Sequence, residues 1–135
     1  MKILVTGAKG FVGKNLCEAL KNIKKLKLED RIDLIYNDAF DVKIDDKFDL
    51  IFIDAAKAQN IKFFEKVSPC LKDNGVIISD NIELLDLQKL TDSKKSKKLV
   101  EKMGLYKQYL LNLEDYETEF LSIGDGFAIT RKIIK

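Results

Sequence analysis

Four polar side chains stand where apolar runs of the chain stop. Asp54 comes directly after one such run, Lys57 follows three residues later, and Asp80-Asn81 closes a second run. Carboxylate and amide oxygens are hard donors that suit Mg²⁺, Ca²⁺ or Mn²⁺ rather than zinc. A lysine close to such donors is a candidate general base if its pKa is lowered. Spacing alone leaves the ordinary alternatives open, which are turn-capping aspartates and a solvated lysine.

A glycine-rich turn near the start of the chain is a second candidate site. Gly7, Gly10 and Gly13 recur at three-residue intervals between a short apolar run and an amphipathic segment. Such a turn lets the backbone approach a phosphate, and it exposes the N–H groups of the following helix to an anion. The alternative is that these glycines only permit a tight turn and close helix packing.

Both candidate sites depend on a sheet that brings strand ends together. The run at 48–53 is apolar, rich in β-favouring residues and without alternation, which is typical of a strand buried on both faces of a parallel sheet. The chain alternates predicted strands with predicted helices and closes on a hairpin, which indicates the α/β class. Strands are expected at 2–6, 31–37, 48–53, 76–79, 116–121 and 127–134, and helices after the glycine turn, at 58–72 and at 91–112.

We therefore predict a mostly parallel, three-layer α/β/α Rossmann-like sheet. Its six strands are expected in the order 2-1-3-4-6-5, with a C-terminal antiparallel hairpin. Ligands of open α/β sheets bind outside the carboxyl ends of the strands, next to the point where the strand order reverses. In this arrangement Gly7–Gly13, Asp38, Asp54 and Asp80-Asn81 rim one crevice.

Composition narrows the class of function. The 135 residues suggest a single domain, and the formal net charge of +2 gives no reason to expect nucleic acid or membrane as a partner. The chain has no histidine, which excludes a histidine general base and a histidine-ligated zinc site. Cys17 and Cys70 lie in apolar contexts and are expected as free buried thiols. With no apolar run of membrane-spanning length and no signal-peptide cleavage site, a cytoplasmic protein is expected.

The first residues resemble the start of extended short-chain dehydrogenase/reductases, the NAD-dependent epimerase family. Thr6-Gly7-Ala8-Lys9-Gly10-Phe11-Val12-Gly13 matches the family's Thr-Gly-x-x-Gly-x-x-Gly, which binds the pyrophosphate of NAD(P). The resemblance covers about the first twenty residues. The family's catalytic Tyr-x-x-x-Lys is missing, because no tyrosine here is followed four positions later by a lysine. This resemblance implies NAD(P) binding by Gly7, Gly10, Gly13 and Asp38 without dehydrogenase chemistry.

The rest of the chain, from about residue 22 to residue 135, resembles the C-terminal part of cation-dependent class I O-methyltransferases. These enzymes use S-adenosylmethionine (SAM) as the methyl donor. Asp38-Ala39 matches the family's Asp-Ala, which borders the adenine of SAM. The segments that carry the match are 28–39, 48–57, 75–81 and 116–126.

That resemblance implies a mechanism and a role for each residue at the strand ends. Asp54, Asp80 and Asn81 would hold Mg²⁺ or another divalent cation, which would bind two vicinal hydroxyls of the acceptor and lower the pKa of one. Lys57 would be the catalytic base that takes its proton. The oxygen would then attack the methyl group of SAM in line, with catalysis mainly from positioning and electrostatics.

The chain departs from both families in a way that predicts a chimera. The methyltransferases' N-terminal helices, acidic glycine-rich strand and ribose-binding acid have no counterpart, and a dehydrogenase-like unit at 1–24 precedes the methyltransferase-like part at 25–135. The fusion could be natural or made in the laboratory. Three hypotheses stay open: a methyltransferase-derived domain with weak or absent catalysis, an NAD(P)-binding module, and an engineered scaffold that binds nothing. A small-molecule ligand and a homodimer formed through uncovered apolar surface are the expected partners.

Overall fold

The computed structural model describes residues 1–7, 21–27, 29–30, 35, 38–83 and 94–134. The chain divides into two compact units, and each is described by itself. One unit comprises Met1–Gly7 with Ile44–Lys135, and the other comprises Ala8–Lys43.

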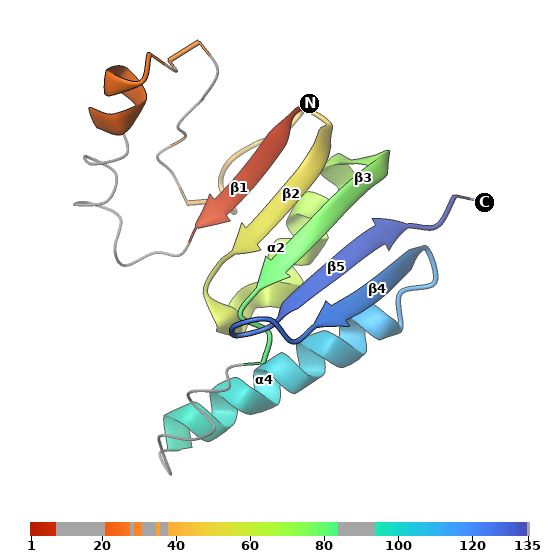
Figure 1. Cartoon of the computed structure of the whole chain (residues 1–135). Helices are drawn as coiled ribbons and strands as arrows, with labels where there is room; N and C mark the ends of the chain where they lie inside the picture. Colours follow the sequence, from red (N-terminus) through yellow and green to blue (C-terminus); the bar gives the residue numbers. More distant parts are fainter. Residues whose placement is uncertain (8–20, 28, 31–34, 36–37, 84–93, 135) are drawn as a thin grey trace. The chain divides into compact units, whose positions relative to one another are not determined.

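The larger unit is built on a five-stranded mixed sheet (Figure 1). Its strands are β1 (Ile3–Gly7), β2 (Phe48–Asp54), β3 (Leu71–Asp80), β4 (Tyr116–Leu121) and β5 (Phe127–Lys132). Their order is β1-β2-β3-β5-β4, in which β1, β2 and β3 are parallel and β5 is antiparallel to both of its neighbours. The α/β class is confirmed, and these five strands follow the predicted order. The predicted strand at 31–37 lies outside the described residues except for Ile35, which belongs to no strand.

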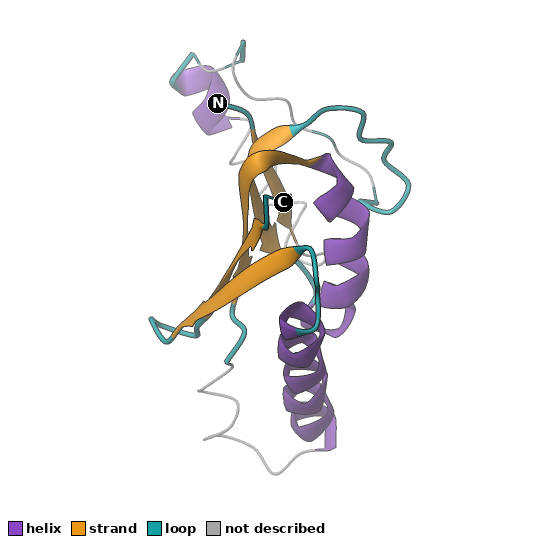
Figure 2. Cartoon of the chain, turned by 90° about the vertical axis from the view of Figure 1, so that its right-hand side faces the viewer, coloured by secondary structure: helices purple, strands orange, loops and turns teal. Residues whose placement is uncertain are grey.

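Two α-helices cover one face of this sheet, α2 (Asn60–Val67) and α4 (Lys94–Leu111) (Figure 2). Short 3₁₀ turns flank α2, namely η1 (Lys57–Gln59) before it and η2 (Ser68–Cys70) after it. The predicted helix at 58–72 thus ends early. Pro69 explains the end, because it lacks an N–H group for the α-helical ladder and stands instead at the start of η2. The helix expected to begin the third layer falls on residues 8–20, outside the described part of the chain.

The core lies between the sheet and the two helices. Ile51, Ile53 and Ile77 are at most 1% exposed and point to the helical face. The alternate residues of the same strands, such as Phe52 and Ile78, are only half-buried. Both described α-helices of the larger unit, α2 and α4, lie on the same face of the sheet (Figure 2). Burial of the run at 48–53 on its second face stays a prediction, because the helix expected there falls outside the described residues.

The start of β3 differs from expectation. Asp73-Asn74-Gly75 has the composition of a turn, yet it lies within the strand. The ladder with β2 shifts register there, since Phe48 pairs with Leu71 whereas Leu50 pairs with Val76. A bulge therefore absorbs the turn residues without ending the strand.

The smaller unit contains a short helical segment at 21–25 and a turn that begins at Asp38. Cys70, in the larger unit, is a buried free thiol, as predicted, and Cys17 lies outside the described residues. Among the helices that the structure describes, none is long and apolar enough to cross a bilayer.

Candidate functional site

The carboxyl ends of the three parallel strands lie side by side at one edge of the sheet. Gly7, the last residue of β1, is in register with Asp54, the last residue of β2. Ile53 is in register with Ser79, so Asp54 and Asp80 both stand at the point where their strands end. All three are predicted from the sequence to rim one crevice, and parallel pairing brings these strand ends together.

Lys57 lies between two of these strand ends. Its Nζ donates a hydrogen bond to the backbone oxygen of Asp80 at 3.2 Å and lies 3.6 Å from Oδ1 of Asp54. The Lys57 side chain is 18% exposed, while that of Asp54 is 54% exposed. The turn that follows β2 explains the geometry: Ala55 is buried, and η1 begins at Lys57, which turns the lysine back over the strand ends. A positively charged group thus already occupies the space beside both aspartates.

Asn81 redirects the chain after β3. Its φ angle is +58°, and asparagine is one of the few residues that adopt this left-handed conformation readily. Its backbone N–H donates to Oδ1 of Asp80 at 2.6 Å, which fixes that carboxylate against the turn. The next two N–H groups, of Ile82 and Glu83, donate to backbone oxygens in the turn between β4 and β5. The candidate ligands therefore stand on a short segment that is held on both sides.

A buried hydrogen bond supports β3 directly before the site. Ser79 Oγ and the Tyr106 hydroxyl are 2.7 Å apart, and both residues are 1% exposed. Burial raises the pKa of Tyr106 well above its ordinary value, and the hydrogen bond with Ser79 offsets only part of that rise. Tyr106 is thus a neutral hydroxyl that links α4 to β3.

The donor chemistry at this edge fits a divalent cation of the Mg²⁺ type. Asp54, Asp80 and Asn81 offer two carboxylates and one amide, all of them oxygen donors, on adjacent strand ends. Nζ of Lys57 lies beside this set, 3.6 Å from Oδ1 of Asp54. Within the described ranges, no group of three or more cysteine, aspartate or glutamate side chains is placed to hold a metal. A cation at these strand ends would therefore need the Asn81 amide as well as the carboxylates.

The remaining predicted site residues belong to the smaller unit, Ala8–Lys43. Gly10 and Gly13 fall outside the described residues. Asp38 and Ala39 belong to the smaller unit, where Oδ1 of Asp38 accepts a hydrogen bond from the Phe40 N–H at 3.1 Å. The Asp38 carboxylate thus closes its own turn.

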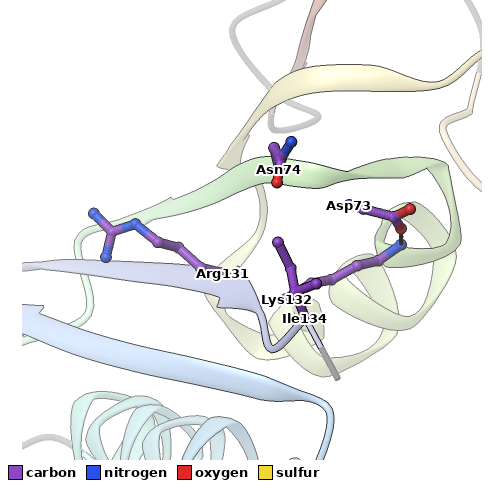
Figure 3. A pocket seen from close by; sticks show the side chains of 6 residues that line it. Asp73, Asn74, Arg131, Lys132 and Ile134 are labelled. Carbon is purple, nitrogen blue, oxygen red and sulfur yellow. Dashed lines mark hydrogen bonds and ion pairs between the residues drawn. The ribbon is translucent and has the colours of Figure 1, made fainter.

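A cavity of about 200 Å³ lies at the opposite end of the sheet (Figure 3). It opens where β3 begins and β5 ends, and Lys132 there donates to the backbone oxygen of Leu71 and pairs with Asp73. Asp54, Lys57, Asp80 and Asn81 are not among the residues that line it. Its lining residues are Asp73, Asn74, Gly75, Arg131, Lys132 and Ile134.

Glu83 is a residue at the strand ends that sequence analysis did not single out. Its carboxylate accepts a hydrogen bond from Ser122 at 2.8 Å and lies 3.8 Å from the Lys107 ammonium. The Ser122 contact joins residues 39 positions apart. No spacing rule along the chain could have predicted it.

Comparison with known families assigns the chain to one of them. A family model described as O-methyltransferase matches residues 12–133, which is most of the chain. The chain belongs to the O-methyltransferase family. The part of the resemblance that rested on the strand ends and on the closing hairpin is thereby confirmed at the level of the family.

Solved structures agree with this O-methyltransferase assignment. A Staphylococcus aureus protein provisionally named a caffeoyl-CoA O-methyltransferase is 31% identical, with a TM-score of 0.79 over 96% of this chain and 63% of its own. The Podospora anserina methyltransferase PaMTH1, bound to SAH (S-adenosylhomocysteine), is 19% identical, with a TM-score of 0.79 over 98% of this chain and 60% of its own. A Bacillus cereus O-methyltransferase in complex with SAH is 22% identical, with a TM-score of 0.71 over 97% and 62%. The last two show a shared fold.

The same comparisons bear on the predicted chimera. The methyltransferase structures just named cover between 96% and 98% of this chain, including most of the part that resembles a dehydrogenase. They therefore give no support to a dehydrogenase component. The O-methyltransferase chain spans about 60% of the length of each of these three relatives.

Proposed function

We propose that this chain carries the catalytic end of a SAM-dependent, cation-dependent O-methyltransferase. The observation that carries the proposal is the position of Lys57, whose Nζ contacts the ends of both β2 and β3 at Asp54 and Asp80. Nζ lies 3.6 Å from the Asp54 carboxylate and donates to the backbone oxygen of Asp80, so a basic amine stands next to the candidate cation ligands, where it is placed to take a proton from a cation-bound hydroxyl. Activation of this kind makes the acceptor oxygen a better nucleophile toward a methyl group.

Each residue at the strand ends has a distinct role in this proposal. Asp54, Asp80 and Asn81 would hold Mg²⁺ or another divalent cation, which when bound polarises the acceptor hydroxyl and lowers its pKa. Lys57 takes the hydroxyl proton on Nζ. The Asp80 carbonyl orients that amine through the hydrogen bond already present, and the exposed side of Asp54 faces the solvent from which an acceptor arrives.

We propose that SAM is the cofactor and that catalysis by this chain alone is weak or absent. Family membership supports SAM, and two of the solved relatives are bound to SAH. Asp38 and Ala39 are the residues proposed to border the adenine, as the resemblance implies. The reason to expect little turnover is length, since about two fifths of each relative's chain has no counterpart in this one.

A second candidate function is NAD(P) binding by the glycine turn. The family match begins at residue 12, so the first two glycines of Thr6–Gly13 lie outside it. Gly7 stands at the end of β1, beside Asp54, where a phosphate-binding turn is expected in a Rossmann-like sheet. On this alternative the first twenty residues or so would be a dehydrogenase-like unit fused to a methyltransferase, and the strand-end acids would be inherited without use.

Calorimetric titration of the chain with SAH, NAD⁺ and Mg²⁺ separates the candidates. Our proposal predicts binding of SAH and of Mg²⁺, with Mg²⁺ binding lost in Asp54→Ala. It predicts no loss in the matched control Asp73→Ala, which removes an aspartate at the other end of the sheet. Binding of NAD⁺ without binding of SAH or Mg²⁺ would support the second candidate function. The similarity to methyltransferases would then reflect common ancestry alone. If none of the three ligands gives a heat of binding at millimolar concentration, the hypothesis of a scaffold that binds nothing stands.

A further inference from the structure

Glu83 holds an enclosed carboxylate two residues after the candidate cation ligands. Its side chain is only 16% exposed. Oε1 accepts a hydrogen bond from the Ser122 hydroxyl at 2.8 Å and lies 3.8 Å from Nζ of Lys107. Ser122 follows β4 and Lys107 belongs to α4, so one carboxylate joins three separate parts of the larger unit.

The backbone beside Glu83 is tied to the same hairpin. The Ile82 N–H donates to the oxygen of Gly126 at 3.1 Å, and the Glu83 N–H donates to the oxygen of Asp125 at 2.9 Å. Gly126 has a φ angle of +80°, and a Cβ placed there would lie 2.5 Å from Cγ of Glu83. The glycine therefore lets the Glu83 side chain lie directly on the turn.

These contacts bear on the geometry of Asp80 and Asn81. The ladder between β3 and β5 ends at Asp80, which pairs with Phe127, and the hydrogen bonds to the turn resume at Ile82. Asn81 lies between these two anchors with a left-handed φ of +58°. Asparagine adopts this conformation readily, and the two anchors fix where the Asp80 carboxylate and the Asn81 amide stand relative to the β4–β5 turn. Loosening the Glu83 anchor would therefore free the Asn81 amide and the Asp80 carboxylate to move.

We propose that Glu83 is a positioning residue for the cation site, acting through the β4–β5 turn and α4. The inference rests on the proposed function, because it takes Asp54, Asp80 and Asn81 as the ligands. Glu83 itself is turned toward Ser122 and Lys107 and does not join the ligand set. Outer contacts of this kind orient ligands, and their removal typically weakens metal affinity by about 10-fold to 100-fold.

The test measures Mn²⁺ affinity of the full chain by electron paramagnetic resonance, with the thermal midpoint recorded for every variant. We expect Glu83→Ala to weaken Mn²⁺ binding by about 10-fold. Glu83→Gln should restore most of the affinity, because the amide oxygen still accepts the Ser122 hydrogen bond. The matched control is Glu119→Ala, which removes an exposed glutamate of β4 that lies 4.0 Å from Arg131. Its affinity should equal that of the wild type.

The outcomes separate this inference from the proposed function. If Asp54→Ala abolishes Mn²⁺ binding while Glu83→Ala binds as the wild type does, the positioning role is wrong and the proposed function stands. If the wild type binds no Mn²⁺, both are overturned. If the loss of Mn²⁺ affinity in Glu83→Ala is no larger than the fraction of that variant that is unfolded, Glu83 stabilises the fold and does not position the ligands. Should Glu83→Ala fail to fold, Ser122→Ala removes one hydrogen bond, and unchanged affinity in that variant would overturn the positioning role.

Discussion

At the scale of single residues, the strand-end aspartates were predictable and their surroundings were not. Asp54 and Asp80 each follow a β-rich apolar run, and parallel pairing then places such residues at one edge. Lys57 was expected because it stands one turn beyond Asp54. Glu83 and its partner Ser122 are 39 residues apart in the sequence, and Tyr106 and its partner Ser79 are 27 residues apart. No local sequence pattern predicts contacts over such separations.

Tyr106→Phe tests the buried link between α4 and β3. The substitution leaves the Ser79 hydroxyl buried without its partner, so the free energy of unfolding at neutral pH should fall by about 1–2 kcal/mol. Urea unfolding of the wild type and of Tyr106→Phe measures this. Equal stability would mean that the hydrogen bond contributes nothing.

The same pair of proteins should differ in their response to high pH. Burial raises the folded-state pKa of Tyr106 above the ordinary tyrosine value of 10.0. Because the neutral form is the one favoured by folding, its contribution is complete below pH 10 and is lost as the pH rises toward the folded-state pKa. Above pH 10 the wild type should lose up to about 1.4 kcal/mol per pH unit more than Tyr106→Phe. Parallel stability curves from pH 9 to 11 would contradict the raised pKa.

At the scale of elements, hydrophobic periodicity predicts the strands and helices that the structure describes. It does not predict all of the residues at which they begin and end, because those depend on single residues and on a bulge. The hairpin of β4 and β5 was predicted closely, since alternation and the Gly-Asp-Gly turn both mark it. The helix predicted at 58–72 ended at Val67 because of Pro69. β3 began at Leu71 because a bulge took up residues that have turn composition.

Two glycine substitutions should move stability in opposite directions. Gly126→Ala places a methyl group 2.5 Å from the Glu83 side chain at a φ of +80°, so we expect a loss of about 1–3 kcal/mol. Gly104→Ala puts a methyl group in open space on α4, where alanine is the better helix former, so we expect a gain of about 0.5–1 kcal/mol. Urea unfolding of both variants checks the pair. Stabilisation by Gly126→Ala would show that the turn does not pack on Glu83 as described.

At the scale of the whole molecule, family membership was readable from four short segments, whereas the predicted fusion of two families was not supported. The glycine motif at Thr6–Gly13 resembles a dehydrogenase, but solved methyltransferases cover nearly all of this chain. A glycine turn after the first strand serves any Rossmann-like sheet, so the motif is weak evidence of origin. The predicted position of Asp38 at the strand-end crevice stays a prediction, because Asp38 lies in the other unit.

The most direct test of the central claim locates the bound cation. Substoichiometric Mn²⁺ broadens the NMR signals of nearby amides, so a titration of the full chain maps the site without any turnover. We predict that the amides of Asp54, Lys57, Asp80 and Asn81 broaden first and that Asp54→Ala removes the effect. Broadening that begins at Asp73 at the opposite end of the sheet, or that spreads evenly over the acidic surface, would contradict a cation site at the strand ends.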